Sequence, residues 1–96
     1  MPNDEENVDK FDRYMTVGHA ELRAGRVANS VLAFEHATEV AYAPFVAAHA
    51  HLMLGKALRL LGKTDKAYIA FKKAVEFAAG NEPLLARIER EQKGGV

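Results

Sequence analysis

The chain has 96 residues, of which 49% are hydrophobic and 27% are charged, a balance typical of one small folded domain. Thirteen basic and thirteen acidic side chains give a formal net charge of zero, which argues against a nucleic-acid partner because such affinity depends mainly on neutralising phosphates. The absence of cysteine excludes disulfides, thiolate metal sites and thiol catalysis.

Residues 1–12 contain five acids and one base. One interpretation places these acids in the first turn of a helix, where the helix dipole favours negative charge. The other is an acidic arm, residues 1–7, that can lie on a basic surface elsewhere on the protein. This amino end is also unlike a secretory signal, so we expect a cytoplasmic protein.

Apolar spacing predicts five helices and no strand, and therefore an all-α fold. The expected helices span 8–24, 26–41, 44–61, 64–79 and 82–93, followed by a flexible tail, 94–96. Gly25, Gly62 and Gly80 each follow an apolar run, where a left-handed helix cap favours glycine. Pro44 suits a first helical turn, and Thr64 fits an N-cap. The apolar stretch 41–54 is interrupted by proline and histidine, so no membrane span is expected.

Two segments of the chain resemble each other at an offset of 37 residues. Eight of the 24 positions from 18 to 41 are identical to their counterparts, whereas chance would supply roughly two. The matching pairs are Gly18/Gly55, Ala20/Ala57, Gly25/Gly62, Ala33/Ala70, Phe34/Phe71, Ala37/Ala74, Glu39/Glu76 and Ala41/Ala78. We interpret this as a duplication of one helical hairpin.

The duplicated glycines predict a close helix crossing. Gly18 and Gly55 lie inside helices, where glycine costs about 1 kcal/mol relative to alanine. That cost is tolerated where a side chain would block the approach of a second helix. Phe34 and Phe71 are then the large side chains that fill the space beside these contacts.

These positions resemble the tetratricopeptide repeat, a helical hairpin of about 34 residues that stacks into a superhelix. The second copy carries the pattern at Leu54, Gly55, Leu58, Gly62, Ala67, Phe71 and Ala74, and the first copy at Tyr14, Val17, Gly18, Gly25, Ser30, Phe34 and Ala37. The resemblance implies a right-handed α-α superhelix of about five antiparallel helices. It divides the single domain 8–93 into repeat one (11–44), repeat two (48–81) and a capping helix (82–93). Glu21 departs from the pattern, because the family has an aromatic residue there.

The resemblance implies a protein-interaction module that binds a peptide or partner helix in a concave groove. The expected groove residues are Met15, His19, Arg23, His49, Leu52, Met53, Lys56 and Arg59. Their basic side chains favour an acidic segment or a free carboxylate. Some family members clamp acidic chaperone tails with Lys, Asn, Asn, Lys and Arg. The matching residues here, Met15, His19, Met53, Pro83 and Arg87, fit only at the last, so that sub-function is not expected.

The alternative is a homo-oligomer or a scaffold that associates through exposed apolar helix edges. Two repeats are fewer than the three usually needed to bury a continuous core. The candidate edge residues are Phe11, Leu32 and Ile69. The same residues can also be ordinary scattered surface apolar side chains.

Enzymatic chemistry is not expected. His49 and His51 point about 200° apart on a helix and cannot share a metal ion. Ser30 is the only serine and lies in no nucleophile motif, and no phosphate-binding loop is present. His51 falls at a packing position, which favours a core histidine with a satisfied ring. We therefore expect neither a cofactor nor a metal.

Overall fold

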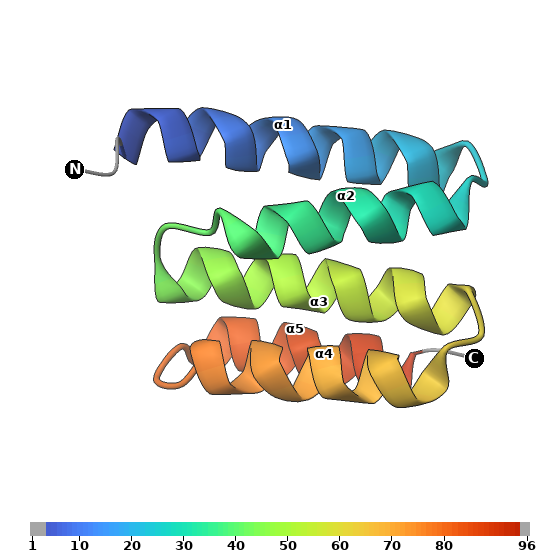
Figure 1. Ribbon diagram of the computed structural model, residues 1–96. Coiled ribbons are helices and arrows are strands. Elements are labelled where there is room, and N and C mark those ends of the chain that lie inside the picture. Colours follow the sequence, from blue (N-terminus) through green and yellow to red (C-terminus); the bar gives the residue numbers. More distant parts are fainter. Residues whose placement is uncertain (1–3, 95–96) are drawn as a thin grey trace.

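The computed structural model describes residues 4–94, which form helices joined by short turns (Figure 1). The helices are α1 (Asp4–Arg23), α2 (Val27–Glu39), α3 (Pro44–Leu60), α4 (Thr64–Phe77) and α5 (Glu82–Lys93). No strand occurs in this part of the chain, which confirms the all-α prediction. α1 to α4 lie side by side as two antiparallel hairpins, and α5 lies behind α4 (Figure 1). No helix between residues 4 and 94 is both long and apolar enough to cross a bilayer.

The amino end differs from one of its two expected forms. α1 begins at Asp4 rather than at Val8, so residues 4–7 are helical and do not form a separate arm. Glu5 and Glu6 therefore lie in the first turn, where the helix dipole stabilises acids. Residues 1–3 of the expected arm and 95–96 of the expected tail lie outside the described residues.

The turns inside the two hairpins are the same. Gly25 and Gly62 have φ values of 82° and 85°, a left-handed conformation that glycine adopts without strain. In the first hairpin the Gly25 and Arg26 amides donate to the carbonyl oxygens of Leu22 (3.1 Å) and Glu21 (2.9 Å). In the second, the amides of Gly62 and Lys63 donate to the equivalent carbonyl oxygens, those of Arg59 and Leu58, at 2.9 Å each. Both helices thus end in the same capping motif, as the duplication predicts.

One predicted cap is wrong. Thr64 is the first helical residue of α4, and the capping position before it is occupied by Lys63, which makes no side-chain capping bond. By contrast, Asn81 does cap α5, because its side-chain oxygen accepts a hydrogen bond from the Leu84 amide at 3.1 Å. A threonine before an apolar run is therefore a weaker indication of the helix start than the preceding glycine turn.

The close crossing predicted at the duplicated glycines is confirmed. A Cβ atom added to Gly55 would lie 2.9 Å from Cε1 of Phe71, and one added to Gly18 would come still closer to the ring of Phe34. Both phenylalanine side chains are buried. The rings occupy the space that a side chain on the first helix of each hairpin would need, which brings the paired helices together.

Glu21 shows why the first repeat departs from the family pattern. Its carboxylate accepts hydrogen bonds from Nε (2.5 Å) and Nη2 (3.1 Å) of Arg26 and from Nδ2 of Asn29 (3.1 Å). These bonds connect the last turn of α1 with the start of α2. Polar contacts of Glu21 thus join the two helices of the first hairpin, at a position where the second repeat has Leu58.

A single hydrophobic cluster extends through both hairpins and reaches α5. Phe34, Leu52 and Ile88 are among its fully buried side chains. Ser30 is also buried, and its hydroxyl is satisfied because it donates to the carbonyl oxygen of Val27 at 2.7 Å. The two copies share one core and are not independent units.

Candidate binding faces

α1 and α3, which are the first helices of the two hairpins, and α5 together contribute five basic or histidine side chains to one candidate face. The His19 and His49 rings, from α1 and α3, lie 6.5 Å apart between centroids. Arg23, Lys56 and Arg87 are close enough to act on His19 electrostatically, and Arg87 also acts on His49. We call this set the basic face: His19, Arg23, His49, Lys56 and Arg87.

The histidines of the basic face are held towards their neutral form. Burial lowers the pKa of His19 below its ordinary value of 6.5, and the charges of Arg23, Lys56 and Arg87 lower it further. Burial is also the main cause of the lowered pKa of His49, with smaller contributions from Arg87 and His19. A bound carboxylate would oppose these shifts, because negative charge favours the protonated ring.

Three of the expected groove residues do not reach the surface. Met15, Leu52 and Met53 are buried in the hydrophobic cluster, so the expectation that they contact a ligand is wrong. The cause is helical phase. A ligand-facing stripe and a core-facing stripe have the same spacing, and the sequence does not reveal how the helix is rotated.

Arg59 also has a different task from the expected one. Its Nη1 donates to the carbonyl oxygen of Glu91 on α5 at 2.6 Å, and its guanidinium lies 5.4 Å from the centroid of the Phe71 ring. Lys56 Nζ lies 3.5 Å from a carboxylate oxygen of the same Glu91. Arg59 therefore holds α5 in place, whereas Lys56 both pairs with Glu91 of α5 and belongs to the basic face.

Arg87 is the member of the basic face that the expected groove did not include. The sequence predicts only a capping role for α5. Applying the offset of 37 residues once more aligns Ile88 with His51, and therefore with Tyr14. By this alignment α5 is equivalent to α1 and α3, the first helices of the two hairpins. That alignment was the available signal, and it was weak because most other α5 positions are charged.

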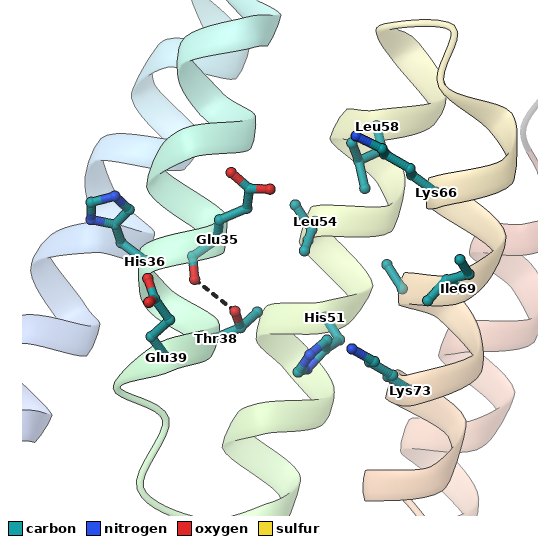
Figure 2. A pocket seen from close by; sticks show the side chains of 11 residues that line it. Glu35, His36, Thr38, Glu39, His51, Leu54, Leu58, Lys66, Ile69 and Lys73 are labelled. Carbon is teal, nitrogen blue, oxygen red and sulfur yellow. Dashed lines mark hydrogen bonds between the residues drawn. The ribbon is translucent and has the colours of Figure 1, made fainter.

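A second candidate face is an outer groove between α2 and α4, with α3 as its floor (Figure 2). Its volume is about 450 Å³. Glu35 and Glu39 lie on its α2 side, and Lys66, Ile69 and Lys73 lie on its α4 side (Figure 2). The remaining lining residues are His36, Thr38, His51, Leu54, Leu58 and Ala70. We call this the outer groove.

His51 in the outer groove is a satisfied histidine, as expected from its packing position. Its Nδ1 lies 2.8 Å from the carbonyl oxygen of Ala47, and its ring stacks on Phe77 at 5.3 Å between centroids. Burial lowers its pKa, with a further contribution from Lys73 that the bond to Ala47 opposes. This histidine is part of the packing of α3 on α4.

The first repeat has an equivalent groove between α1 and α2, with a volume of about 490 Å³. Its lining residues Tyr14, Val17, Leu32 and Ala33 precede His51, Leu54, Ile69 and Ala70 of the outer groove by 37 positions. The outer groove has an additional wall from the preceding repeat, formed by the end of α2. The duplication therefore repeats a surface as well as a core.

The candidate edge residues fall into two groups. Phe11 is buried and makes an edge-to-face contact with Tyr42, 5.8 Å between ring centroids, so its assignment to an exposed edge is wrong. Leu32 and Ile69 are 57% and 53% exposed, at equivalent positions of α2 and α4. Within residues 4–94, no group of three or more acidic or histidine side chains is arranged to hold a metal ion.

Comparison with protein-family models matches residues 48–81 to the tetratricopeptide repeat. No curated protein and no solved structure matches the chain. The matched residues are those that the family resemblance assigns to the second repeat, and they contain most of α3, all of α4 and the Gly62 turn. Residues 48–81 are therefore identified as a tetratricopeptide repeat.

Proposed function

We propose that the protein is a non-catalytic interaction module whose basic face binds an acidic, extended segment of a partner protein. Tetratricopeptide repeats are typical of protein–protein interaction modules. The observation that supports an acidic partner is that Arg23, Lys56 and Arg87, from three different helices, all act electrostatically on His19. Cations that converge on one surface attract acidic segments and favour their binding.

The net charge of zero makes this proposal more specific, because the chain as a whole does not attract acidic molecules. A protein with a large positive charge would attract any polyanion, whereas here the attraction is confined to a local surface. Exposed charges more than about 10 Å apart are screened from one another at 0.1 M salt. Binding of an acidic segment should therefore weaken as salt concentration rises, and it should depend on the residues of this face.

The test is the binding of a fluorescein-labelled decapeptide of alternating Asp and Glu to the full chain, measured by fluorescence anisotropy. The double variant Arg23→Glu/Arg87→Glu should raise Kd by at least about tenfold. The control Arg13→Glu/Lys63→Glu makes the same change in charge at exposed residues outside the basic face, and it should change Kd by less than about twofold. Arg59 is left intact in both variants because it holds α5.

Circular dichroism of each variant checks that the helices are retained. Equal loss of binding in the two double variants would show non-specific attraction and would contradict the proposal. So would the absence of binding by the unmodified protein at low salt.

A further inference from the structure

The outer groove carries opposite charges on its two walls. Glu35 and Glu39 project from α2, and Lys66 and Lys73 project from α4 (Figure 2). All four residues are exposed. Within residues 4–94 none of the four forms an ion pair, although ion pairs occur elsewhere on the surface. The two walls therefore present unneutralised charge of opposite sign beside an apolar floor.

The α4 wall has the form of a ridge. Lys66, Ile69 and Lys73 are spaced i, i+3 and i+7, so they lie along one stripe of the helix. Ile69 at the middle of this stripe is 53% exposed. Leu54 and Leu58 on the floor of the groove are almost completely buried. One helix edge thus combines a protruding apolar side chain with flanking positive charges.

We propose that the outer groove binds a second copy of this chain, with α4 of each copy lying in the groove of the other. Ile69 of one copy then packs over the partner's Leu54 and Leu58, and the lysines on either side of it face the partner's Glu35 and Glu39. Because the contact is twofold, each copy contributes one acidic wall and one basic ridge. This self-association uses a different surface from the basic face and does not depend on the proposed function.

The choice of a second copy rests on charge complementarity. The ridge and the wall that would receive it have opposite charge, and both are present on every copy. A net charge of zero adds no long-range repulsion between copies. Where α4 of one copy meets helices of the other, the rows of side chains on each can interdigitate, as they do between packed helices in general.

The equivalent groove of repeat one lacks these features, and it supplies a matched control. Asn29 and His36 replace Lys66 and Lys73, and Leu32 replaces Ile69. Leu32 and Ile69 have nearly the same exposure, 57% and 53%. A charge placed at either residue should have a similar effect on the monomer, but only a charge at Ile69 should disturb the proposed contact.

The first experiment is sedimentation equilibrium of the full chain up to about 1 mM, where even weak self-association is detected. The unmodified protein should form dimers. Ile69→Asp should raise the dimer Kd by at least about tenfold, and Leu32→Asp should leave it within about twofold. The proposal would be overturned if the unmodified chain remained monomeric. It would also be overturned if the two substitutions had equal effects on the dimer Kd.

The second experiment exchanges the charges. The variants Glu35→Lys/Glu39→Lys and Lys66→Glu/Lys73→Glu should each dimerise less strongly, because like charges then face each other twice. Mixed in equal amounts, they should form a heterodimer, since one contact is native and the other has both of its charges reversed. A mixture that associates no better than the separate variants would show that these walls do not meet.

Discussion

At the scale of single residues, the duplicated glycines determine how closely the hairpin helices approach. Gly55→Ala should gain about 1 kcal/mol of helix propensity, but the added Cβ meets the buried Phe71 ring at 2.9–3.1 Å and should cost about 1–3 kcal/mol. We expect a net loss of about 1 kcal/mol in the free energy of unfolding, measured with urea. Gly18→Ala should cost more, because the Phe34 ring is closer.

The smaller side chain in Phe71→Leu provides the control for this prediction. In that background Gly55→Ala should become neutral or stabilising, since the ring that blocks the Cβ is gone. Equal destabilisation by Gly55→Ala in both backgrounds would contradict the steric argument, and the cost would then lie in the backbone.

Three histidines make stability depend on pH. The pKa values of His19, His49 and His51 are all lowered, mainly by burial. Between these lowered values and the ordinary value of 6.5, the unfolded chain binds more protons than the folded one, so stability falls as pH falls. We expect a lower thermal midpoint at about pH 5.5 than at about pH 7.5. Glu21 and Glu89 also have lowered pKa values, but their contribution is lost only below about pH 4.5.

The double variant His19→Gln/His49→Gln tests the source of this pH dependence. It removes two of the three groups and should flatten the change in thermal midpoint between the two pH values. A protein that is more stable at the lower pH, or a double variant with an unchanged slope, would contradict this account.

At the scale of elements, α5 is the most weakly integrated helix. Ile88 is its only buried side chain, and Glu91 ties it to Lys56 and Arg59 of α3. Ile88→Ala should cost about 2–5 kcal/mol if α5 stays docked, and less if the helix detaches. We expect detachment, seen in hydrogen-exchange mass spectrometry as faster exchange over residues 82–93 with α1 to α4 still protected. Faster exchange throughout α3 and α4 as well would show that α5 belongs to the same cooperative unit.

The sequence predicts the number and kind of elements well, because local signals decide them. Gly25 and Gly62 adopt the left-handed backbone conformation that favours glycine, so the positions of the hairpin turns could be predicted from the sequence. The surface was less predictable. Met15 and Met53 share the spacing of a ligand-facing stripe, and only the three-dimensional structure shows that they are buried in the hydrophobic cluster. The outer groove was not predictable either, because it joins α2 with α4 across the boundary between repeats.

At the scale of the whole molecule, each hairpin depends on its neighbour for burial. Val31 on α2 is 7% exposed, whereas Tyr68, the equivalent residue on α4, is 64% exposed. α3 packs along α2, whereas α5 packs much less extensively against α4. The next helix in the array, rather than the hairpin itself, therefore decides whether this position is buried.

The first hairpin alone should consequently be unstable. In a fragment of residues 1–43, Val31 would lose the cover of α3, and the remaining core would be too small to offset the loss of chain entropy. We expect the fragment to show little helix by circular dichroism at 25 °C, and the full chain to unfold in a single main transition. A fragment with the helix content of α1 and α2 would contradict this. It would mean that contacts inside one repeat, such as Phe34 on Gly18 and Arg26 on Glu21, are enough to fold the hairpin. Stacking of the hairpins would then be needed only to shape the two candidate faces.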